Sequence, residues 1–309
     1  MYPRLSDLFS DLFGFTLPIP IYSFGAMVAV AVLTAMWLTQ RELDRIYADG
    51  RISGVRVSTE KTKRGRPAMK EASPSALIGT VTVLAVVLGI AGSKLFHILE
   101  NLDTFAADPL GMIFSTGGLS FYGGLVLAGL TIAWFVRRKG VELGAFADAM
   151  APGLMLGYGI GRIGCHLAGD GDWGIPADMS LKPDWIPTWL WAETYPNNFL
   201  GIDITAPGVY PTSIYEFVFA ALLFGVLWIY RKHPYRNGWL FSFYLLLNGI
   251  ERMLIEQIRV NNEFDVLGLT VTQAEVIAGL IVATGLVGLG LTWKRRLREV
   301  PPNAVASPA

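Results

Sequence analysis

Seven stretches of the chain are apolar and long enough to cross a lipid bilayer, and they constrain the fold more than any other feature. A membrane-spanning helix needs about 20 mostly apolar residues. Hydrophobic residues make up 52% of the chain and charged residues 16%, which is untypical of a soluble domain. We therefore expect an all-α, polytopic integral membrane protein, a single transmembrane domain over 1–309 with seven transmembrane helices. The stretches are 19–39, 76–98, 118–136, 146–166, 213–230, 239–259 and 274–293.

Lysine and arginine are distributed unevenly between the segments that connect these stretches. Basic residues are frequent after the first, third, fifth and seventh stretches. The other connections carry no basic residue at 99–117 and 260–273, and only Lys182 at 167–212. Because short loops rich in lysine and arginine stay in the cytoplasm, this asymmetry predicts an N-terminus outside and a C-terminus in the cytoplasm.

Two connecting segments are long enough to form substructures of their own. Within the basic cytoplasmic loop 41–75, residues 49–74 are polar, contain glycine and proline and lack an apolar period. We expect this part to be disordered, to anchor the topology and to attract anionic lipids. We expect 167–212 to form an ordered cap at the outer face, because indole rings prefer the membrane interface. Its indoles are Trp173, Trp185, Trp189 and Trp191.

Composition argues against several kinds of site and partner. The single cysteine, Cys165, excludes an internal disulfide and a metal site made of cysteines alone. The histidines His97, His166 and His233 have no His-x-x-x-His spacing, so no metal is expected. A net charge of zero argues against nucleic acid as a partner. The lack of an internal repeat argues against the repeated architectures of secondary transporters.

Charged residues occur inside the fourth and sixth apolar stretches, near the expected outer surface. Arg252, Glu256 and Arg259 follow one another at intervals of four and three residues, which places them on one helix face. In the fourth stretch, Arg162 precedes His166 by one turn. Charges within a bilayer are costly unless they are paired or hydrated. An ion pair that only fixes helix register would explain the sixth stretch, whereas an anion site would explain both arginines, with a phospholipid headgroup as the obvious anion.

Glycines are frequent near the outer ends of the third and fourth stretches. The sequence GGLSFYGG occupies 117–124, and GYGIGRIG occupies 157–164. Small residues let helices pack closely, or they let a ligand approach the backbone. The sequence leaves both interpretations open.

Four motifs follow one another along the chain. They are GRIGCHLAGDGDWG at 161–174, YPTSIYE at 210–216, R-x-x-x-E-x-x-R at 252–259 and LGLTVTQ at 267–273. Each motif is weak alone. In this order, within seven apolar stretches, they make the chain resemble the phosphatidylglycerol:prolipoprotein diacylglyceryl transferases over nearly its whole length.

The resemblance implies an enzyme that transfers the diacylglyceryl group of phosphatidylglycerol to the thiol of the lipobox cysteine in the signal peptide of a bacterial prolipoprotein. Glycerol 1-phosphate is released, and the reaction is the first step of lipoprotein maturation. The family acts among the membrane lipids of the bacterial inner membrane, with its active site toward the periplasmic side. It needs no cofactor and no metal.

The resemblance also implies roles for individual positions. Arg162 matches the arginine that binds the phosphatidylglycerol headgroup, Arg252 matches the essential arginine of the sixth stretch, and Glu256 matches the acid one turn later. An extra residue in this chain leaves open which aspartate stands for the signature acid. The further positions expected to bind substrate are Gly174, Tyr215, Glu216, Arg259 and either Asp170 or Asp172.

Four positions depart from the family pattern. Tyr122 stands where a histidine is frequent, Cys165 replaces an asparagine, and Asn248 and Phe24 each replace a tyrosine. In a membrane helix, Cys165 is expected to be a small apolar residue and not a nucleophile.

These departures leave the general base open among Tyr122, His166 and Glu256. A weak base is sufficient for this reaction, because nearby cations lower the pKa of an attacking thiol. Arg162 and Arg252 are expected to supply that field and to stabilise the leaving phosphate.

Two other functions remain candidates from the sequence. Tyr122 and Asn248 suggest a catalytically altered paralogue that binds lipid or lipoprotein without transferring. A small-solute transporter would use Arg252 and Glu256 as an ion path. The polar groups, however, gather near one surface instead of crossing the span.

Overall fold

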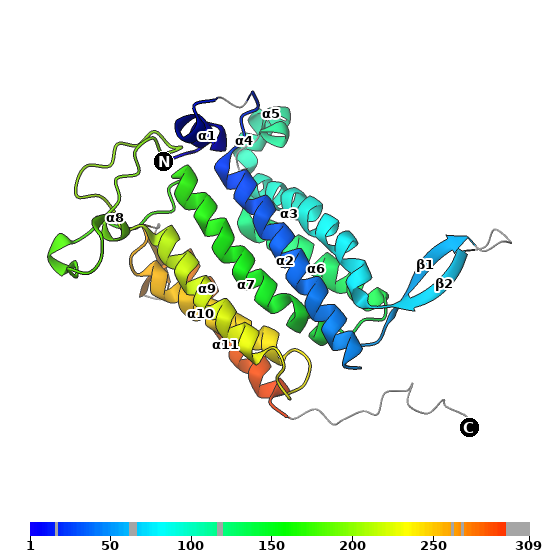
Figure 1. Cartoon of the computed structure of the whole chain (residues 1–309). Coiled ribbons are helices and arrows are strands. Elements are labelled where there is room, and N and C mark those ends of the chain that lie inside the picture. The colour runs from blue at the N-terminus through cyan, green and yellow to red at the C-terminus, as the bar shows by residue number, and fades with distance from the viewer. Residues whose placement is uncertain (16–17, 62–66, 116–119, 261–262, 267–268, 295–309) are drawn as a thin grey trace, which may run out of the picture. The chain divides into compact units, whose positions relative to one another are not determined.

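Long helices make up most of the structure, a computed structural model that describes residues 1–15, 18–61, 67–115, 120–260, 263–266 and 269–294 (Figure 1). Each long helix coincides with one of the predicted apolar stretches, so the mostly helical class is confirmed. In the described residues, the helices of 18 residues or more are α2 (Ser23–Ala48), α3 (Ile78–Glu100), α6 (Phe121–Arg138), α7 (Leu143–Ala168), α9 (Thr212–Tyr230), α10 (Trp239–Glu256) and α11 (Gln273–Thr292).

By length and composition, five described helices qualify as membrane spans: α2, α3 with the turn before it, α7, α9 and α11. Helix α10 carries three charged residues, Glu251, Arg252 and Glu256. The protein is thus a multi-pass membrane protein, while the count of seven spans and their orientation stay predictions. Residues 118–119, at the start of the third predicted span, lie outside the described residues.

The chain divides into two units. Unit 1 contains Met1–Leu38 and the described residues of Ala147–Val300, and unit 2 contains the described residues of Thr39–Phe146. Shorter elements are α1 (Leu5–Phe13), α4 (Leu102–Ala107), α5 (Pro109–Phe114), α8 (Thr188–Trp191), the 3-10 turns η1 (Pro74–Leu77) and η2 (Met179–Leu181), and the strands β1 (Val55–Lys61), β2 (Pro67–Ala72), β3 (Glu263–Val266) and β4 (Leu269–Thr272).

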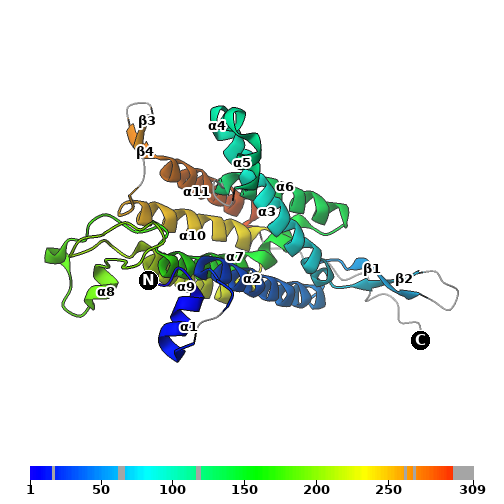
Figure 2. The same cartoon turned by 90° about the horizontal axis from the view of Figure 1, so that it is seen from above.

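Glycines bring the helices of unit 1 into close contact. A Cβ added to Gly159 of α7 would lie 2.8 Å from the Cβ of Ala220 on α9. A Cβ added to Gly285 of α11 would lie 2.6 Å from the backbone nitrogen of Leu246 on α10. Figures 1 and 2 show α9, α10 and α11 side by side. Small residues permit such close packing, so Gly159 of the sequence GYGIGRIG serves helix packing.

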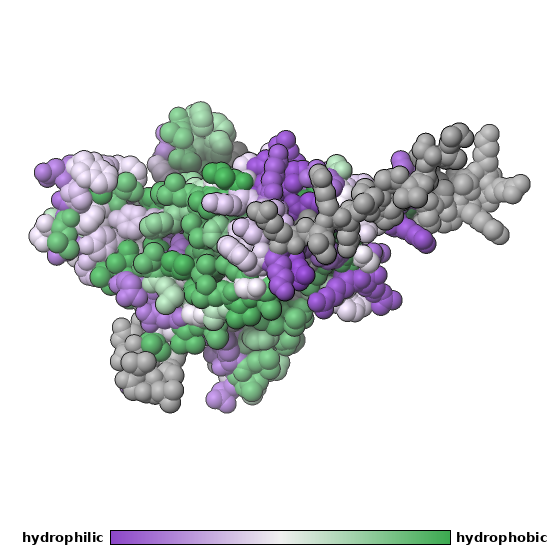
Figure 3. Space-filling model, turned by 90° about the horizontal axis from the view of Figure 1, so that it is seen from below, coloured by the Kyte–Doolittle hydropathy of each residue, from purple (hydrophilic) through white to green (hydrophobic). Residues whose placement is uncertain are grey.

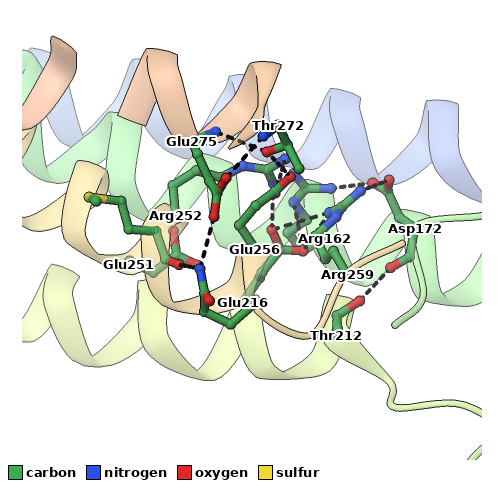
Figure 4. A network of polar contacts seen from close by, with 12 residues as sticks. Arg162, Asp172, Thr212, Glu216, Glu251, Arg252, Glu256, Arg259, Thr272 and Glu275 are labelled. Atoms are coloured by element: carbon green, nitrogen blue, oxygen red, sulfur yellow. Dashed lines mark hydrogen bonds and ion pairs between the residues drawn. The ribbon is translucent and has the colours of Figure 1, made fainter. Parts of the chain in front are cut away.

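The helices of unit 1 place two different kinds of group at their two ends. Helices α7 and α10 end where α9 and α11 begin, and the charged residues described below gather there (Figure 4). At the opposite end, the Asp148 carboxylate accepts hydrogen bonds of 2.8 Å from the backbone N–H groups of Gly238 and Phe241. Asp148 therefore caps the first turn of α10. The apolar core of the unit includes Met155, Leu227 and Leu240.

Unit 2 contains a close helix pair. A Cβ added to Gly92 of α3 would lie 2.5 Å from the carbonyl oxygen of Gly123 on α6. A Cβ added to Gly124 would likewise lie 2.5 Å from the carbonyl oxygen of Gly89 on α3. Gly123 and Gly124 of the sequence GGLSFYGG therefore serve packing, whereas residues 117–119 of that sequence lie outside the described part of the chain.

The basic segment 41–75 is more ordered than expected. Helix α2 continues to Ala48, and β1 and β2 form an antiparallel hairpin in which Val55 pairs with Ala72 and Val57 with Lys70. The prediction of a disordered loop over 49–74 was therefore wrong for this part, since an alternation of apolar and polar residues starting at Val55 supports a strand. Residues 62–66 lie outside the described residues.

Many large hydrophobic side chains are exposed, and they cover much of the face drawn in Figure 3. Among them, Leu222 and Ile229 on α9 and Leu280 and Leu291 on α11 are more than 60% exposed. Soluble proteins rarely expose apolar patches of such extent. These helix faces are suited to contact lipid, which supports the membrane class.

The segment 167–212 has a defined backbone held by its own contacts. Buried Asn198 donates hydrogen bonds to the carbonyl oxygens of Tyr195 and Ile202 at 3.0 and 2.6 Å. Two of its indoles, Trp185 and Trp189, are exposed. That this cap lies at the outer face of the membrane stays a prediction.

Candidate active site

Charged residues from three helices and two adjoining segments meet at one end of unit 1 (Figure 4). Helix α7 supplies Arg162, α9 supplies Glu216, and α10 supplies Arg252 and Glu256. The remaining members are Asp172, which follows α7, and Arg259, which follows α10. We call these six residues the charge network.

Glu216 is the centre of the charge network and is fully buried. Its carboxylate lies 3.3 Å from Nε of Arg162, 3.2 Å from a terminal nitrogen of Arg252 and 3.4 Å from a terminal nitrogen of Arg259. The Tyr158 hydroxyl donates a hydrogen bond of 2.8 Å to the same carboxylate. A buried carboxylate is stable only when it is paired and hydrogen-bonded. Glu216 therefore holds three cationic side chains together where α7, α9 and α10 meet.

Asp172 links two of the same arginines from the other side. One carboxylate oxygen forms an ion pair with Arg162, and the other forms one with Arg259. Burial acts to raise the pKa of Asp172, but the two guanidiniums outweigh it and hold that pKa below its usual value. Asp172 is therefore a carboxylate at neutral pH.

The backbone around Asp172 is fixed to the start of α9 and the end of α10. The hydroxyls of Thr212 and Ser213 donate hydrogen bonds of 2.7 and 2.9 Å to the Asp172 carbonyl oxygen. Gly174 forms a backbone bridge with Arg259, and a Cβ at Gly174 would lie only 2.5 Å from the Ile258 carbonyl oxygen. Gly174 thus permits the close approach that places Asp172 beside Arg259.

Arg252 connects the network to the start of α11. It lies 3.2 Å from Glu256, the partner expected from the spacing of four residues. Glu256 also accepts a hydrogen bond of 2.7 Å from the Thr272 hydroxyl. Thr272 in turn forms a capping box with Glu275 at the first turn of α11. Of the LGLTVTQ motif, residues 267–268 lie outside the described residues.

Two residues expected at the site contact the cap segment instead. The Tyr215 hydroxyl donates a hydrogen bond of 2.7 Å to the carbonyl oxygen of Leu190. His166 packs edge-on against Tyr195, with Nδ1 3.3 Å from the Tyr195 hydroxyl. The catalytic role of His166 and the substrate contact of Tyr215 stay predictions.

The other sequence candidates have different surroundings. Tyr122 lies on α6 in unit 2, so its role as a base stays a prediction. Asp170 accepts a hydrogen bond of 3.3 Å from the backbone N–H of Asp172. Burial, followed by the charge of Asp172, raises the pKa of Asp170. Cys165 is buried, with Sγ 3.9 Å from Arg162.

The sequence did not single out Tyr158, Glu251 or Thr272. The ring of Tyr158 lies 5.1 Å from the Arg162 guanidinium, and its hydroxyl reaches Glu251 at 3.4 Å as well as Glu216. Tyr158 precedes Arg162 by one helical turn, so the rule that residues four apart share a face was the signal for it. The contact of Thr272 with Glu256 joins distant segments and left no sequence signal.

The arrangement brings together three side chains of a kind that binds anions. Guanidiniums remain charged at all relevant pH values and contact phosphate through two parallel hydrogen bonds. Cys165, Asp170 and Asp172 also place three potential metal-ligand atoms within 4.8 Å of one another. Both oxygens of Asp172 already face guanidiniums, however, and a cation there would meet the charges of Arg162 and Arg259.

Comparison with known proteins yields one family. The family model for prolipoprotein diacylglyceryl transferase matches residues 12–291. Relatives named phosphatidylglycerol--prolipoprotein diacylglyceryl transferase occur in Corynebacterium glutamicum, with 27% identity over 94% of this chain and 86% of the relative, and in Corynebacterium diphtheriae, with 28% identity over 91% of each. Another, from Dehalococcoides mccartyi, is 30% identical over 72% of this chain and 80% of its own length. The chain therefore belongs to the prolipoprotein diacylglyceryl transferase family.

Proposed function

We propose that the charge network binds the phosphate of phosphatidylglycerol while the chain transfers the diacylglyceryl group to the lipobox cysteine of a bacterial prolipoprotein. The convergence of three guanidiniums on buried Glu216 carries this proposal. Three fixed cations form a preorganised site for a phosphate group. Membership of the family supports the proposed reaction, and the charge network offers a binding site for the phosphate of the substrate.

The reaction exchanges one bond for another at the diacylglyceryl carbon that carries the phosphate. The cysteine sulfur forms a bond to this carbon, and the carbon–oxygen bond to the phosphate breaks. Glycerol 1-phosphate leaves with the bonding electrons, and the thiol proton is lost to a base or to the solvent. Arg162 and Arg252 favour both changes, since cations stabilise an attacking thiolate and the charge on the leaving phosphate. The base belongs to the set Tyr122, His166 and Glu256.

The same proposal places the protein in the inner membrane, with the charge network toward the periplasm. In unit 1, basic residues follow the helix ends opposite the network, with Arg231 and Lys232 after α9 and Lys294 after α11. Basic segments stay in the cytoplasm. The network at the other end of these helices would then open toward the outer leaflet and toward an exported prolipoprotein.

The test is transfer by the purified protein in lipid vesicles that contain labelled phosphatidylglycerol and a lipobox peptide. We expect label on the peptide and a loss of about a hundredfold or more with Arg162→Ala, as for other preorganised charge-stabilising donors. Arg231→Ala, at the opposite end of α9, is the matched control and should retain activity.

Full activity of Arg162→Ala would contradict the proposed site. If the unmutated protein bound lipid without labelling the peptide, the altered paralogue would be favoured. The positions to examine would then be Tyr122, Cys165 and Asn248, where the chain departs from the family pattern.

A further inference from the structure

Asp172 occupies the position of an anion between two arginines. Its two carboxylate oxygens contact different guanidiniums, those of Arg162 and Arg259. A phosphodiester also presents two oxygens that share a negative charge, and guanidiniums bind carboxylate and phosphate in the same way. The Asp172 carboxylate therefore makes the contacts that a bound phosphate would make.

Asp172 is the more exposed of the two carboxylates that flank Arg162 and Arg259. Its side chain is 29% exposed, whereas that of Glu216 is 0% exposed. Arg162 and Arg259, between the two carboxylates, are 17% and 8% exposed. Of these two carboxylates, Asp172 is thus the one that an anion from outside can reach, while Glu216 holds the arginines from the buried side.

The surrounding contacts let the Asp172 side chain move while its backbone stays in place. Thr212 and Ser213 hold the backbone carbonyl, and Gly174 is fixed to the segment that carries Arg259. The carboxylate itself is held by the two arginines and by a hydrogen bond from the Cys165 thiol, a weak donor. Rotation about the Cα–Cβ bond would release it without disturbing the bridge at Gly174.

We propose that Asp172 is an internal counter-anion that holds the empty phosphate site and that the substrate phosphodiester binds by displacing its carboxylate. This inference rests on the proposed function, because it takes Arg162 and Arg259 as ligands of the phosphate. The exchange replaces one negative charge by another at the same guanidiniums. The arginines therefore keep a partner with and without lipid, as charges near a bilayer require.

The test measures binding to the full-length protein in detergent, because displacement predicts that removing the competitor tightens binding. The probes are dihexanoyl phosphatidylglycerol and glycerol 1-phosphate, and dissociation constants are measured by titration calorimetry at fixed salt. We expect Asp172→Asn to bind about tenfold more tightly, since the anion no longer displaces charged hydrogen bonds. Asp203→Asn removes the same charge from an exposed position of the cap segment and should change binding by about twofold or less.

Weaker or unchanged binding by Asp172→Asn would overturn the inference and would mean that Asp172 only orients the arginines. Asp172→Ser also removes the charge and repeats the comparison, so the result does not depend on the folding of one variant. Tightening toward the lipid alone identifies a lipid phosphate as the displacing anion, and tightening toward glycerol 1-phosphate alone identifies a free phosphate. Absence of peptide labelling in the transfer assay would contradict the proposed function, whereas tightening by Asp172→Asn would still support displacement.

Discussion

Unit 1 holds a buried carboxylate at each end, and the two are stabilised in different ways. Asp148 is hydrogen-bonded by the backbone N–H groups of Gly238 and Phe241, and its carboxylate lies 3.4 Å from His233. Glu216 is surrounded by three arginine side chains and a tyrosine hydroxyl. A carboxylate at the first turn of a helix satisfies groups that every helix leaves unpaired. A carboxylate paired with three arginines instead brings three guanidinium groups together at one end of the unit.

Burial alone does not distinguish a structural carboxylate from a functional one. Asp148 and Glu216 are both buried. Their partners differ: those of Asp148 are mainly backbone groups, which cannot leave, while those of Glu216 are side chains able to bind a second anion. We therefore expect loss of Asp148 to affect stability and loss of Glu216 to affect transfer.

The largest effect is expected from Glu216→Gln. The neutral amide leaves three guanidiniums close together without their common anion, and breaking a buried ion pair costs about 3–5 kcal/mol. We expect transfer to the lipobox peptide to fall by about a hundredfold or more, as the arginines lose their positions. The measurement is the vesicle transfer assay beside a thermal unfolding curve of the same sample. Transfer at the unmutated rate would refute the role of the charge network.

A smaller effect is expected from Gly174→Ala, which alters the network through the backbone. The new Cβ would lie 2.5 Å from the Ile258 carbonyl oxygen, so the bridge to Arg259 must open. We expect transfer to fall by about tenfold, because small displacements of a positioning segment reduce catalysis strongly. The matched control is Gly225→Ala in α9, where an added Cβ has no neighbour within 4 Å. Equal rates for the two variants would show that the bridge does not position Arg259 for the reaction.

The sequence predicted what depends on local spacing. The apolar stretches predicted the long helices, and the spacing of four residues predicted the pair of Arg252 with Glu256. Arg162 and the charged residues of α10 were also expected to lie near the same outer surface of the membrane. Glu216 was expected at the site only through the family resemblance, since nothing local shows that a glutamate in α9 contacts three arginines of other segments.

The sequence did not predict contacts between distant segments or features that depend on the backbone conformation. The extra residue in GDGDWG left Asp170 and Asp172 equivalent, whereas in the structure Asp172 forms the ion pairs with Arg162 and Arg259. His166 follows Arg162 by one turn and packs against Tyr195, a contact that the sequence did not predict, and its catalytic role stays a prediction. The hairpin of β1 and β2 was missed because charged residues obscured a short alternation that begins at Val55.

The smallest effect on transfer is expected from Asp148→Ala, which tests the structural side of the comparison. The variant loses two hydrogen bonds to the first turn of α10, and loss of a helix cap costs about 1–2 kcal/mol. Thermal unfolding should therefore begin at a lower temperature, while transfer below that temperature stays within about twofold of the unmutated rate. Asp148 and Glu216 lie at opposite ends of unit 1, on α7 and α9. If Asp148→Ala reduced transfer as much as Glu216→Gln does, the charge network would depend on the packing of α10 along its whole length. The distinction between a structural and a functional carboxylate would then fail.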